Sequence, residues 1–249
     1  MSFQYRQKSE KILADSSLFI ISDIHANLPA LEAVLKNIPD NAQIICAGDI
    51  VGYYTEPNEV CELLRRRGAS CIRGNHDLYV LNLKSFDPGR DSMYRSTWTS
   101  EQLNRANREW LESLPDFLDF SVEKKAPDKS GAMLPYDSML LRHGSLTDAE
   151  EYIYPDTQFR YEQIPGRSVL VLGHTHHPML RRSGSSCIVN PGSIGQPRDR
   201  DPKASFASVD LMSGAIEFFR LEYDVAGYQK RLVASDVAPQ AIDILSLTK

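Results

Sequence analysis

The 249-residue sequence predicts an α/β protein built around two packed β-sheets. In its first half, short apolar segments alternate with helices of about ten residues, which is typical of βαβ units and a largely parallel sheet. In its second half, short strand candidates follow one another between turn residues, which favours a more antiparallel sheet. Hydrophobic residues make up 42% of the chain, enough at this length to bury a sizeable core.

The elements of the first half follow from strand-like apolar runs and from helical spacing of apolar residues. Pro57 marks the start of the second helix and Gly68 lies just past its end. The expected order is a strand at 18–22, a helix at 28–38, a strand at 44–47, a helix at 57–67 and a strand at 70–73.

The remainder of the chain adds helices and then strands. Thr99 and Gln102 form a capping-box pattern ahead of a helix that Pro115 ends. Strands are expected at 139–142, 168–172, 187–190, 206–210 and 216–223. We therefore expect a single domain over residues 1–249, with a helical insertion near 78–114 and a C-terminal helical segment near 225–248.

Composition excludes several classes of function. With 28 basic and 33 acidic residues the chain carries a net charge of −5, which argues against broad nucleic-acid binding and against a polybasic membrane anchor. Its most apolar run is too short to span a bilayer, and the N-terminus has no secretory signal, so a cytoplasmic protein is expected. The four cysteines form no C-x-x-C pair and are interpreted as reduced thiols. Nothing in the sequence indicates an oligomeric state.

Polar residues gather just after the predicted strands. Ligand sites of open α/β sheets lie outside the carboxyl ends of the strands, so these segments are expected to meet at one rim. They are Asp23-Ile24-His25, Gly48-Asp49, Gly74-Asn75-His76-Asp77, His143-Gly144 and Gly173-His174-Thr175-His176. Five of the six histidines fall in these segments and only His177 is left over.

The donor types in these segments favour a pair of transition-metal ions. In D-x-H and H-x-H, residues i and i+2 project to the same side of an extended chain and can grip an ion together. Carboxylates, an amide and imidazoles form a mixed N/O set that suits Mn, Fe, Ni, Co or Zn better than Ca. Seven candidate ligands exceed the need of one tetrahedral zinc. The candidates are Asp23, His25, Asp49, Asn75, His143, His174 and His176.

Each motif taken alone has a simpler interpretation. Asp23-x-His25 is more often a turn with a helix cap than a ligand pair, and Gly74-Asn75-His76-Asp77 could be a turn capped by Asp77. The combination and order of the motifs favour the metal site.

The five motifs resemble those of the calcineurin-like metallophosphoesterases. The match extends through SDIHANLPALEAVL, GDIVGYYTEPNEV, RHGS and VNPGSIGQPRD, which resemble a narrower branch of small bacterial and archaeal enzymes. The resemblance implies a four-layer α/β/β/α sandwich of two mixed β-sheets, with the site where loops of the two sheets meet.

The resemblance also implies a role for each residue. Asp23, His25 and His176 would bind one ion, Asn75, His143 and His174 the other, and Asp49 would bridge them. His76 would be catalytic, close to the departing oxygen of the substrate. The implied reaction is hydrolysis of a small phosphoester by a hydroxide held between two divalent ions, with Mn favoured.

Two departures from relatives narrow the activity. Ser/Thr protein phosphatases carry Gly-Asp-x-x-Asp-Arg-Gly, whereas Gly52 and Tyr53 stand here in place of the Asp that orients the catalytic His and the Arg that holds phosphate. Asp77 is left as a candidate partner for His76. Purple acid phosphatases have a metal-binding Tyr where this chain has Gly52, so their colour is not expected.

A phosphodiesterase is the favoured function. One alternative is a dinucleoside polyphosphate hydrolase, which would act on a nucleotide. Another is a protein phosphatase-like activity, and the third is a catalytically silent binding scaffold on the same fold. The presence of all seven ligand candidates and of His76 speaks against the scaffold.

Other polar side chains are interpreted more simply. Five tyrosines are interpreted as surface or core packing residues rather than as lining of the substrate pocket: Tyr53, Tyr54, Tyr152, Tyr154 and Tyr161. Three arginines are interpreted as surface residues rather than as phosphate contacts: Arg73, Arg198 and Arg200.

Overall fold

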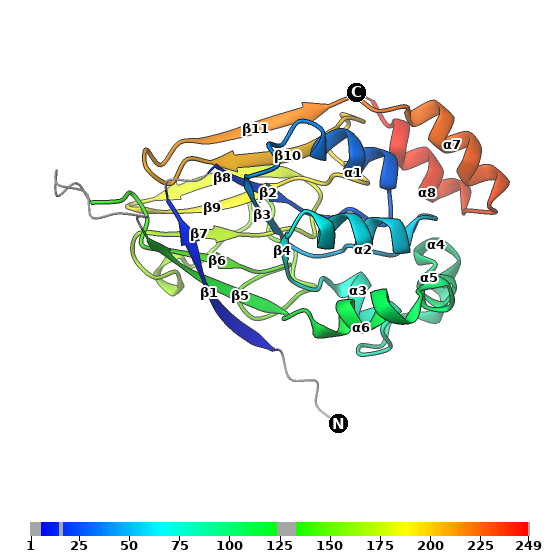
Figure 1. The fold of residues 1–249 in the computed structure, drawn as a ribbon, viewed down its shortest axis with the longest axis horizontal. Coiled ribbons are helices and arrows are strands. Elements are labelled where there is room, and N and C mark those ends of the chain that lie inside the picture. Colours follow the sequence, from blue (N-terminus) through cyan, green and yellow to red (C-terminus); the bar gives the residue numbers. More distant parts are fainter. Residues whose placement is uncertain (1–5, 15–16, 124–132, 249) are drawn as a thin grey trace.

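The computed structural model describes residues 6–14, 17–123 and 133–248. Within these residues the chain forms two mixed β-sheets that pack face to face, with helices gathered on one side and at one end (Figure 1). The predicted α/β fold with two mixed sheets is confirmed.

The smaller sheet contains the parallel strands expected in the first half of the chain. Its five strands lie in the order β11 (Ile216–Leu221), β10 (Ala204–Val209), β2 (Leu18–Ile21), β3 (Gln43–Cys46) and β4 (Ser70–Cys71). β2, β3 and β4 are parallel, and β10 runs antiparallel to both β2 and β11.

The larger sheet is also mixed. Its six strands lie in the order β1 (Gln7–Leu13), β5 (Phe117–Glu123), β6 (Ser138–Leu141), β7 (Ser168–Val171), β9 (Ser186–Pro191) and β8 (Pro178–Ser183). β6, β7 and β9 are parallel, so β6 and β7 end at the same edge.

The core between the sheets follows the two-residue period of the strands. Leu18 and Ile20 of β2 point into this core, as do Leu118 and Phe120 of β5. Phe19, between the two β2 residues, instead packs on the opposite face of the smaller sheet. Alternation of this kind lets one strand contribute to two apolar layers.

Three helices cover the outer face of the smaller sheet. They are α1 (Leu28–Leu35), α2 (Pro57–Arg66) and α6 (Arg105–Ser113). Leu31, Leu64 and Leu111 of these helices join one buried cluster with strand residues such as Ile44. α1 begins at Asn27, whose side chain accepts a hydrogen bond from the backbone amide of Ala30.

The outer face of the larger sheet is covered mainly by the chain between β6 and β7. Ile153 and Ile164 of this segment pack on Leu170 and Ile188 of the sheet. The segment includes the short 3-10 helix η2 (Tyr161–Gln163).

The remaining helices lie together at one end of the molecule, where α4 and α5 are near α7 and α8 (Figure 1). They are α3 (Asn75–Val80), η1 (Pro88–Arg90), α4 (Asp91–Tyr94), α5 (Ser96–Gln102), α7 (Val225–Ala234), α8 (Pro239–Asp243) and η3 (Ile244–Ser246). Tyr228 and Leu232 of α7 pack against Tyr53 and Tyr54, which follow β3. The C-terminal segment therefore braces the loop after β3.

Several elements differ from the prediction. β1, β5 and β8 were not expected from the sequence. The capping-box prediction at Thr99 is wrong, because Thr99 lies inside α5 and a separate helix, α6, follows. Asn104 caps α6 by accepting a hydrogen bond from the amide of Asn107, so a new helix begins here instead of a continuation of α5.

None of the helices in the described ranges has both the length and the apolar character needed to cross a membrane.

Candidate metal centre

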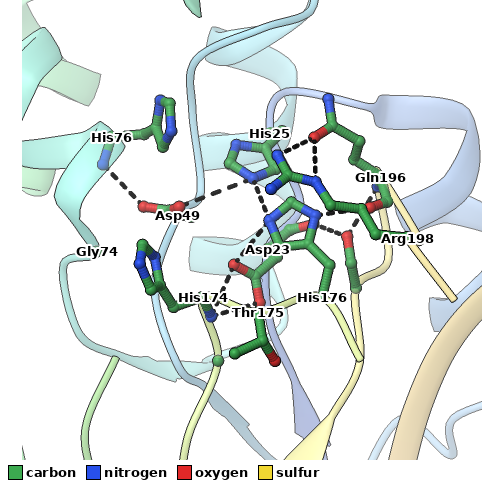
Figure 2. A network of polar contacts seen from close by, with 12 residues as sticks. Asp23, His25, Asp49, Gly74, His76, His174, Thr175, His176, Gln196 and Arg198 are labelled. Carbon is green, nitrogen blue, oxygen red and sulfur yellow. Dashed lines mark hydrogen bonds and ion pairs between the residues drawn. The ribbon is translucent and has the colours of Figure 1, made fainter. Parts of the chain in front are cut away.

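The polar segments predicted at strand ends do converge. Asp23 and His25 follow β2, Asp49 follows β3, and Asn75 opens α3 just after β4. His143 follows β6, and His174 and His176 follow β7. All seven side chains are buried. Figure 2 shows Asp23, His25, Asp49, His174 and His176 gathered at one place, where loops of the two sheets meet.

Four of them form a first cluster, made of Asp23, His25, Asp49 and His176. Their potential ligand atoms all lie within 4.8 Å of one another. The Nε2 atoms of His25 and His176 are 3.1 Å apart, and Nε2 of His176 lies 3.3 Å from Oδ1 of Asp23. Lone pairs of four buried side chains thus point at one small volume.

A second cluster contains Asp49, His143 and His174 and shares Asp49 with the first. Nε2 of His143 lies 3.2 Å from Oδ2 of Asp49 and 3.1 Å from Oδ1 of Asn75. Asn75 therefore belongs to this side of the site. A carboxylate common to two adjacent clusters can bridge two ions.

The candidate ligands reach the site from backbone in the left-handed region, not from an extended chain whose side chains alternate. Asp23, His25 and Asp49 each have φ of 52°, and His174 and His176 have φ of 65° and 60°. The predicted i, i+2 projection from an extended chain is therefore wrong for these motifs. Asp and His tolerate this region better than most residues, but each such residue still costs about 1 kcal/mol. Strain collected at one place is typical of a functional site.

Glycine is required where β3 and α3 approach. A Cβ atom at position 74 would lie 2.2 Å from Oδ1 of Asp49. Asp77, in the first turn of α3, accepts hydrogen bonds from the amides of Gly74, Ile50 and Val51 at 2.9–3.0 Å. Its carboxylate thus ties α3 to the loop that carries Asp49. Among the described residues it forms no hydrogen bond with the His76 ring, whose Nδ1 has no partner.

Backbone carbonyls orient the imidazoles. Nδ1 of His143 lies 2.7 Å from the carbonyl oxygen of Ala47, and Nδ1 of His176 lies 2.6 Å from that of Gln196. Nε2 of His174 lies 3.2 Å from the carbonyl oxygen of Glu150. Each contact places a proton on the nitrogen facing the carbonyl and leaves the other nitrogen with a lone pair for a ligand.

Burial keeps most of these imidazoles neutral. It lowers the pKa of His174 to about 3 and the pKa of His25 and His176 well below the ordinary value. For His143, burial alone would lower the pKa, but the carboxylates of Asp49 and Asp23 raise it to about 10. A cation beside Asp49 would replace that proton.

One buried oxygen atom, Oδ2 of Asp49, indicates that the two clusters can accommodate a divalent ion. Oδ2 of Asp49 accepts no well-aligned hydrogen bond, although Nε2 of His143 is 3.2 Å away and Nε2 of His25 is 3.7 Å away. An unsatisfied buried carboxylate oxygen facing two imidazoles is unfavourable unless a cation joins them. The mixed N/O donors suit a transition metal.

Comparison with known proteins places this geometry in a family. A model described as the calcineurin-like phosphoesterase superfamily domain matches residues 17–214. The chain belongs to this superfamily. An uncharacterized protein of Methanocaldococcus jannaschii is 31% identical over 244 residues, covering 89% of this chain and 93% of the relative.

Two further relatives carry functional names. The phosphodiesterase YfcE of Escherichia coli is 26% identical over 208 residues, covering 78% of this chain and 86% of its own. The crystal structure of a metallophosphoesterase from Sphaerobacter thermophilus is 31% identical, with a TM-score of 0.74, and the match covers 93% of this chain and 98% of that one. The resemblance to metallophosphoesterases is confirmed, and metal-dependent phosphoester hydrolysis is the activity of the superfamily.

Within this calcineurin-like chain, His76 borders both clusters. Its backbone amide donates to Oδ1 of Asp49 at 2.9 Å, and its ring centroid lies 5.1 Å from that of His25 and 4.5 Å from that of Tyr94. Nδ1 is buried without a partner, and a Cβ atom at Gly52 would lie only 3.4 Å from it. The acidic partner that protein phosphatases place there is thus absent. Burial lowers the pKa of His76 to about 4.

A cleft of 470 Å³ opens beside the clusters. Five of the residues predicted for the site line this cleft: Asp49, Asn75, His76, His174 and His176. Residues that sequence reasoning did not assign to the site complete it: Tyr79, Arg90, Met93, Tyr94, Glu150 and Ile244. They come from the helical segment after β4, from the loop after β6 and from the C-terminal helices, and no motif marks them.

Two of the tyrosines predicted to be packing residues line the cleft. Tyr53 is buried in an apolar cluster, as predicted, and also borders the cleft. Tyr152 lines the cleft with its ring centroid 4.1 Å from that of His174. Tyr54 is a packing residue, with its hydroxyl donating to the carbonyl of Ala241 at 2.9 Å.

The three arginines differ from one another. Arg73 is not at the surface as predicted, because Nε and Nη2 donate to the two carboxylate oxygens of buried Asp116 at 3.0 Å each. Arg198 lines the cleft, and Arg200 is exposed.

Proposed function

We propose that this protein is a phosphodiesterase with a dinuclear metal centre in which Asp49 bridges two divalent ions. The supporting observation is the sharing of Asp49 between the two clusters. One ion would be held by Asp23, His25 and His176, and the other by Asn75, His143 and His174. The mixed nitrogen and oxygen donors suit Mn, Fe, Ni, Co or Zn. Of these we propose Mn²⁺ as the ion to test first.

Such a pair of ions, when bound, would neutralise charge on the phosphoryl oxygens and activate a water for attack on phosphorus. The residues of the chain would hold and orient the reactants. Asp49 is fixed for this by the His76 amide on one oxygen, which leaves the other oxygen for the ions. The carbonyls of Ala47 and Gln196 keep the His143 and His176 rings in one orientation.

His76 would act on the leaving group as a neutral imidazole. Its pKa near 4, a result of burial, leaves it without the extra proton of an imidazolium at pH 7. It would therefore donate a hydrogen bond to the departing oxygen rather than deliver a proton from a charged ring.

A nucleotide-directed activity is the second candidate, and the composition of the cleft favours it. Tyr53, Tyr79, Tyr94 and Tyr152 line the wall next to the clusters. Aromatic side chains stack on nucleobases, so a diester or a dinucleoside polyphosphate with a base on its leaving group would gain contacts there. A protein phosphatase-like activity is less favoured because Gly52 leaves Nδ1 of His76 unpartnered.

We place the enzyme in the cytoplasm, where its four free, buried cysteines would stay reduced.

The test compares three substrates on protein loaded with Mn²⁺: an aryl phosphodiester, an aryl phosphomonoester and a dinucleoside tetraphosphate. We expect the diester to be hydrolysed at least about tenfold faster than the monoester in kcat/KM. Asp49→Asn should abolish turnover, whereas His177→Gln should not, because His177 lies next to the H-x-H motif but outside both clusters. A monoester preference, or full activity in Asp49→Asn, would contradict the proposal.

A further inference from the structure

Two arginines line the cleft among the described residues, and they differ in environment. Arg90 is exposed and donates to the hydroxyl of Tyr94. Arg198 is half-buried, and its side chain reaches back from its loop towards His25 and His176 (Figure 2). A half-buried guanidinium normally has an anionic partner, since desolvation of a charge is unfavourable without one.

We infer that Arg198 forms an anion subsite of the cleft and holds a non-bridging oxygen of the phosphoryl group beside the metal centre. This inference rests on the proposed function, because it assumes that the cleft receives a phosphoester. It assigns to Arg198 the phosphate contact that protein phosphatases make with the arginine at the position of Tyr53.

Neutral groups alone hold the guanidinium. Nη2 donates to Oε1 of Gln196 at 2.6 Å and to the hydroxyl of Tyr53 at 3.3 Å, and Nε donates to the same Gln196 oxygen at 3.2 Å. Within the described parts of the chain Arg198 forms no ion pair with a carboxylate. These contacts fix the direction of the guanidinium without pairing it directly with a carboxylate among the described residues.

One edge of the guanidinium remains available to a ligand. Nη1 makes no hydrogen bond to a described residue, whereas Nε and Nη2 are both used. A charge-assisted hydrogen bond from Nη1 to a phosphoryl oxygen would satisfy this edge and neutralise the charge together. Tyr53 then acts as a support that orients the arginine.

The loop that carries Arg198 is tied to the metal cluster. The carbonyl oxygen of Gln196 accepts from Nδ1 of His176 at 2.6 Å, while its side chain accepts from Arg198. Ser193 donates to the carbonyl of Asp23 at 2.7 Å and accepts from the Gln196 amide at 2.8 Å. The subsite is therefore built at a fixed position relative to Asp23 and His176, which reduces the entropy lost on binding.

The experiment measures binding of inorganic phosphate to the full-length, Mn²⁺-loaded protein by isothermal titration calorimetry. Arg198→Met removes the charge and keeps the apolar stem of the side chain. We expect it to weaken phosphate binding about 10- to 100-fold, the loss typical of one charge-assisted hydrogen bond. Arg200→Met is the matched control, since it removes the same charge from an exposed position in the same loop and should change the affinity less than about twofold.

Two more variants separate anion binding from a purely structural role. Arg198→Lys keeps the charge but not the planar fork, so it should recover part of the affinity. Tyr53→Phe removes the supporting hydroxyl and should weaken phosphate binding less than Arg198→Met. Unchanged phosphate affinity in Arg198→Met, or an affinity loss explained by loss of bound Mn²⁺ in elemental analysis, would overturn the inference.

The calorimetry does not depend on turnover, so the two proposals can fail separately. If the wild-type protein hydrolyses the diester but Arg198→Met binds phosphate normally, only the anion subsite is refuted. If the wild-type protein binds phosphate through Arg198 but hydrolyses no diester, the subsite stands and the phosphodiesterase is refuted. A loaded wild-type protein that binds no phosphate refutes the subsite.

Discussion

The two carboxylate oxygens of Asp49 have different environments. Oδ1 accepts the backbone amide of His76, whereas Oδ2 faces the Nε2 atoms of His25 and His143 without a well-aligned donor. One oxygen is therefore used to position the side chain and the other is left for a cation. Such a division could not be read from the Gly-Asp motif, which indicates a ligand but not which atom is held.

A substitution of His76 shows whether this residue contacts the leaving group or binds a metal ion. In His76→Gln we expect kcat for the diester to fall about 100-fold, the lower range for loss of a positioned acid–base group. Bound Mn²⁺ should stay within about 20% of wild type in elemental analysis, because the His76 ring lies outside both clusters. Loss of half of the metal would place His76 among the ligands instead.

The neutral state of His76 has a consequence for the pH profile. A required imidazolium would make kcat fall as pH rises through its pKa, but a pKa near 4 leaves the ring neutral at every pH above about 5. We therefore expect the ratio of wild-type to His76→Gln kcat to stay constant between about pH 5.5 and 8.5. A ratio that declines as pH rises through 6 to 7 would show that the charged ring is needed.

At the scale of elements, the junction of β3 with α3 positions Asp49. Gly74→Ala adds a Cβ atom that would lie 2.2 Å from Oδ1 of Asp49. We expect a loss of about 1–3 kcal/mol in the free energy of unfolding and a marked loss of bound Mn²⁺, measured by urea denaturation and elemental analysis.

Gly166→Ala is the control for that substitution. A Cβ atom at Gly166 meets no other atom within 4 Å, so the change should stay within about 0.5 kcal/mol. Equal metal content in wild type and Gly74→Ala would mean that Asp49 can move without affecting the centre.

The strands that carry the site were predictable from the sequence, whereas β1, β5 and β8 of the larger sheet were not predicted. β2, β3 and β7 are short apolar runs followed by polar motifs, so both element and site could be read together. β1 offers no such signal, since Ile12 is its only buried residue and its other residues are exposed or partly exposed. β5 does alternate, with Leu118, Phe120 and Val122 buried, and this two-residue period is the signal by which a strand is recognised.

At the scale of the whole molecule, the cleft is assembled from segments far apart in the chain. Its motif-bearing half was predictable because ligand types cluster at strand ends. The tyrosine wall was not, because it depends on how α4 and the C-terminal helices pack around Tyr53 and Tyr94. The backbone carbonyls of Ala47, Glu150 and Gln196 that orient the histidines also have no signal in the sequence.

Metal should stabilise the whole fold because the clusters join segments of both sheets. At Mn²⁺ concentrations about 100-fold above Kd, binding contributes about 2.7 kcal/mol, which corresponds to a rise in Tm of about 5–10 °C for a chain of this size. Differential scanning calorimetry with Mn²⁺ and with a chelator measures the difference. The rise should largely disappear in Asp49→Asn, and a full rise in that variant would locate the stabilising ion elsewhere.

The most direct test of a two-ion centre is anomalous diffraction from crystals soaked in Mn²⁺, recorded near the manganese absorption edge. We predict two peaks on either side of Asp49, one among Asp23, His25 and His176 and the other among Asn75, His143 and His174. A single peak, or peaks that do not share Asp49, would contradict the dinuclear centre.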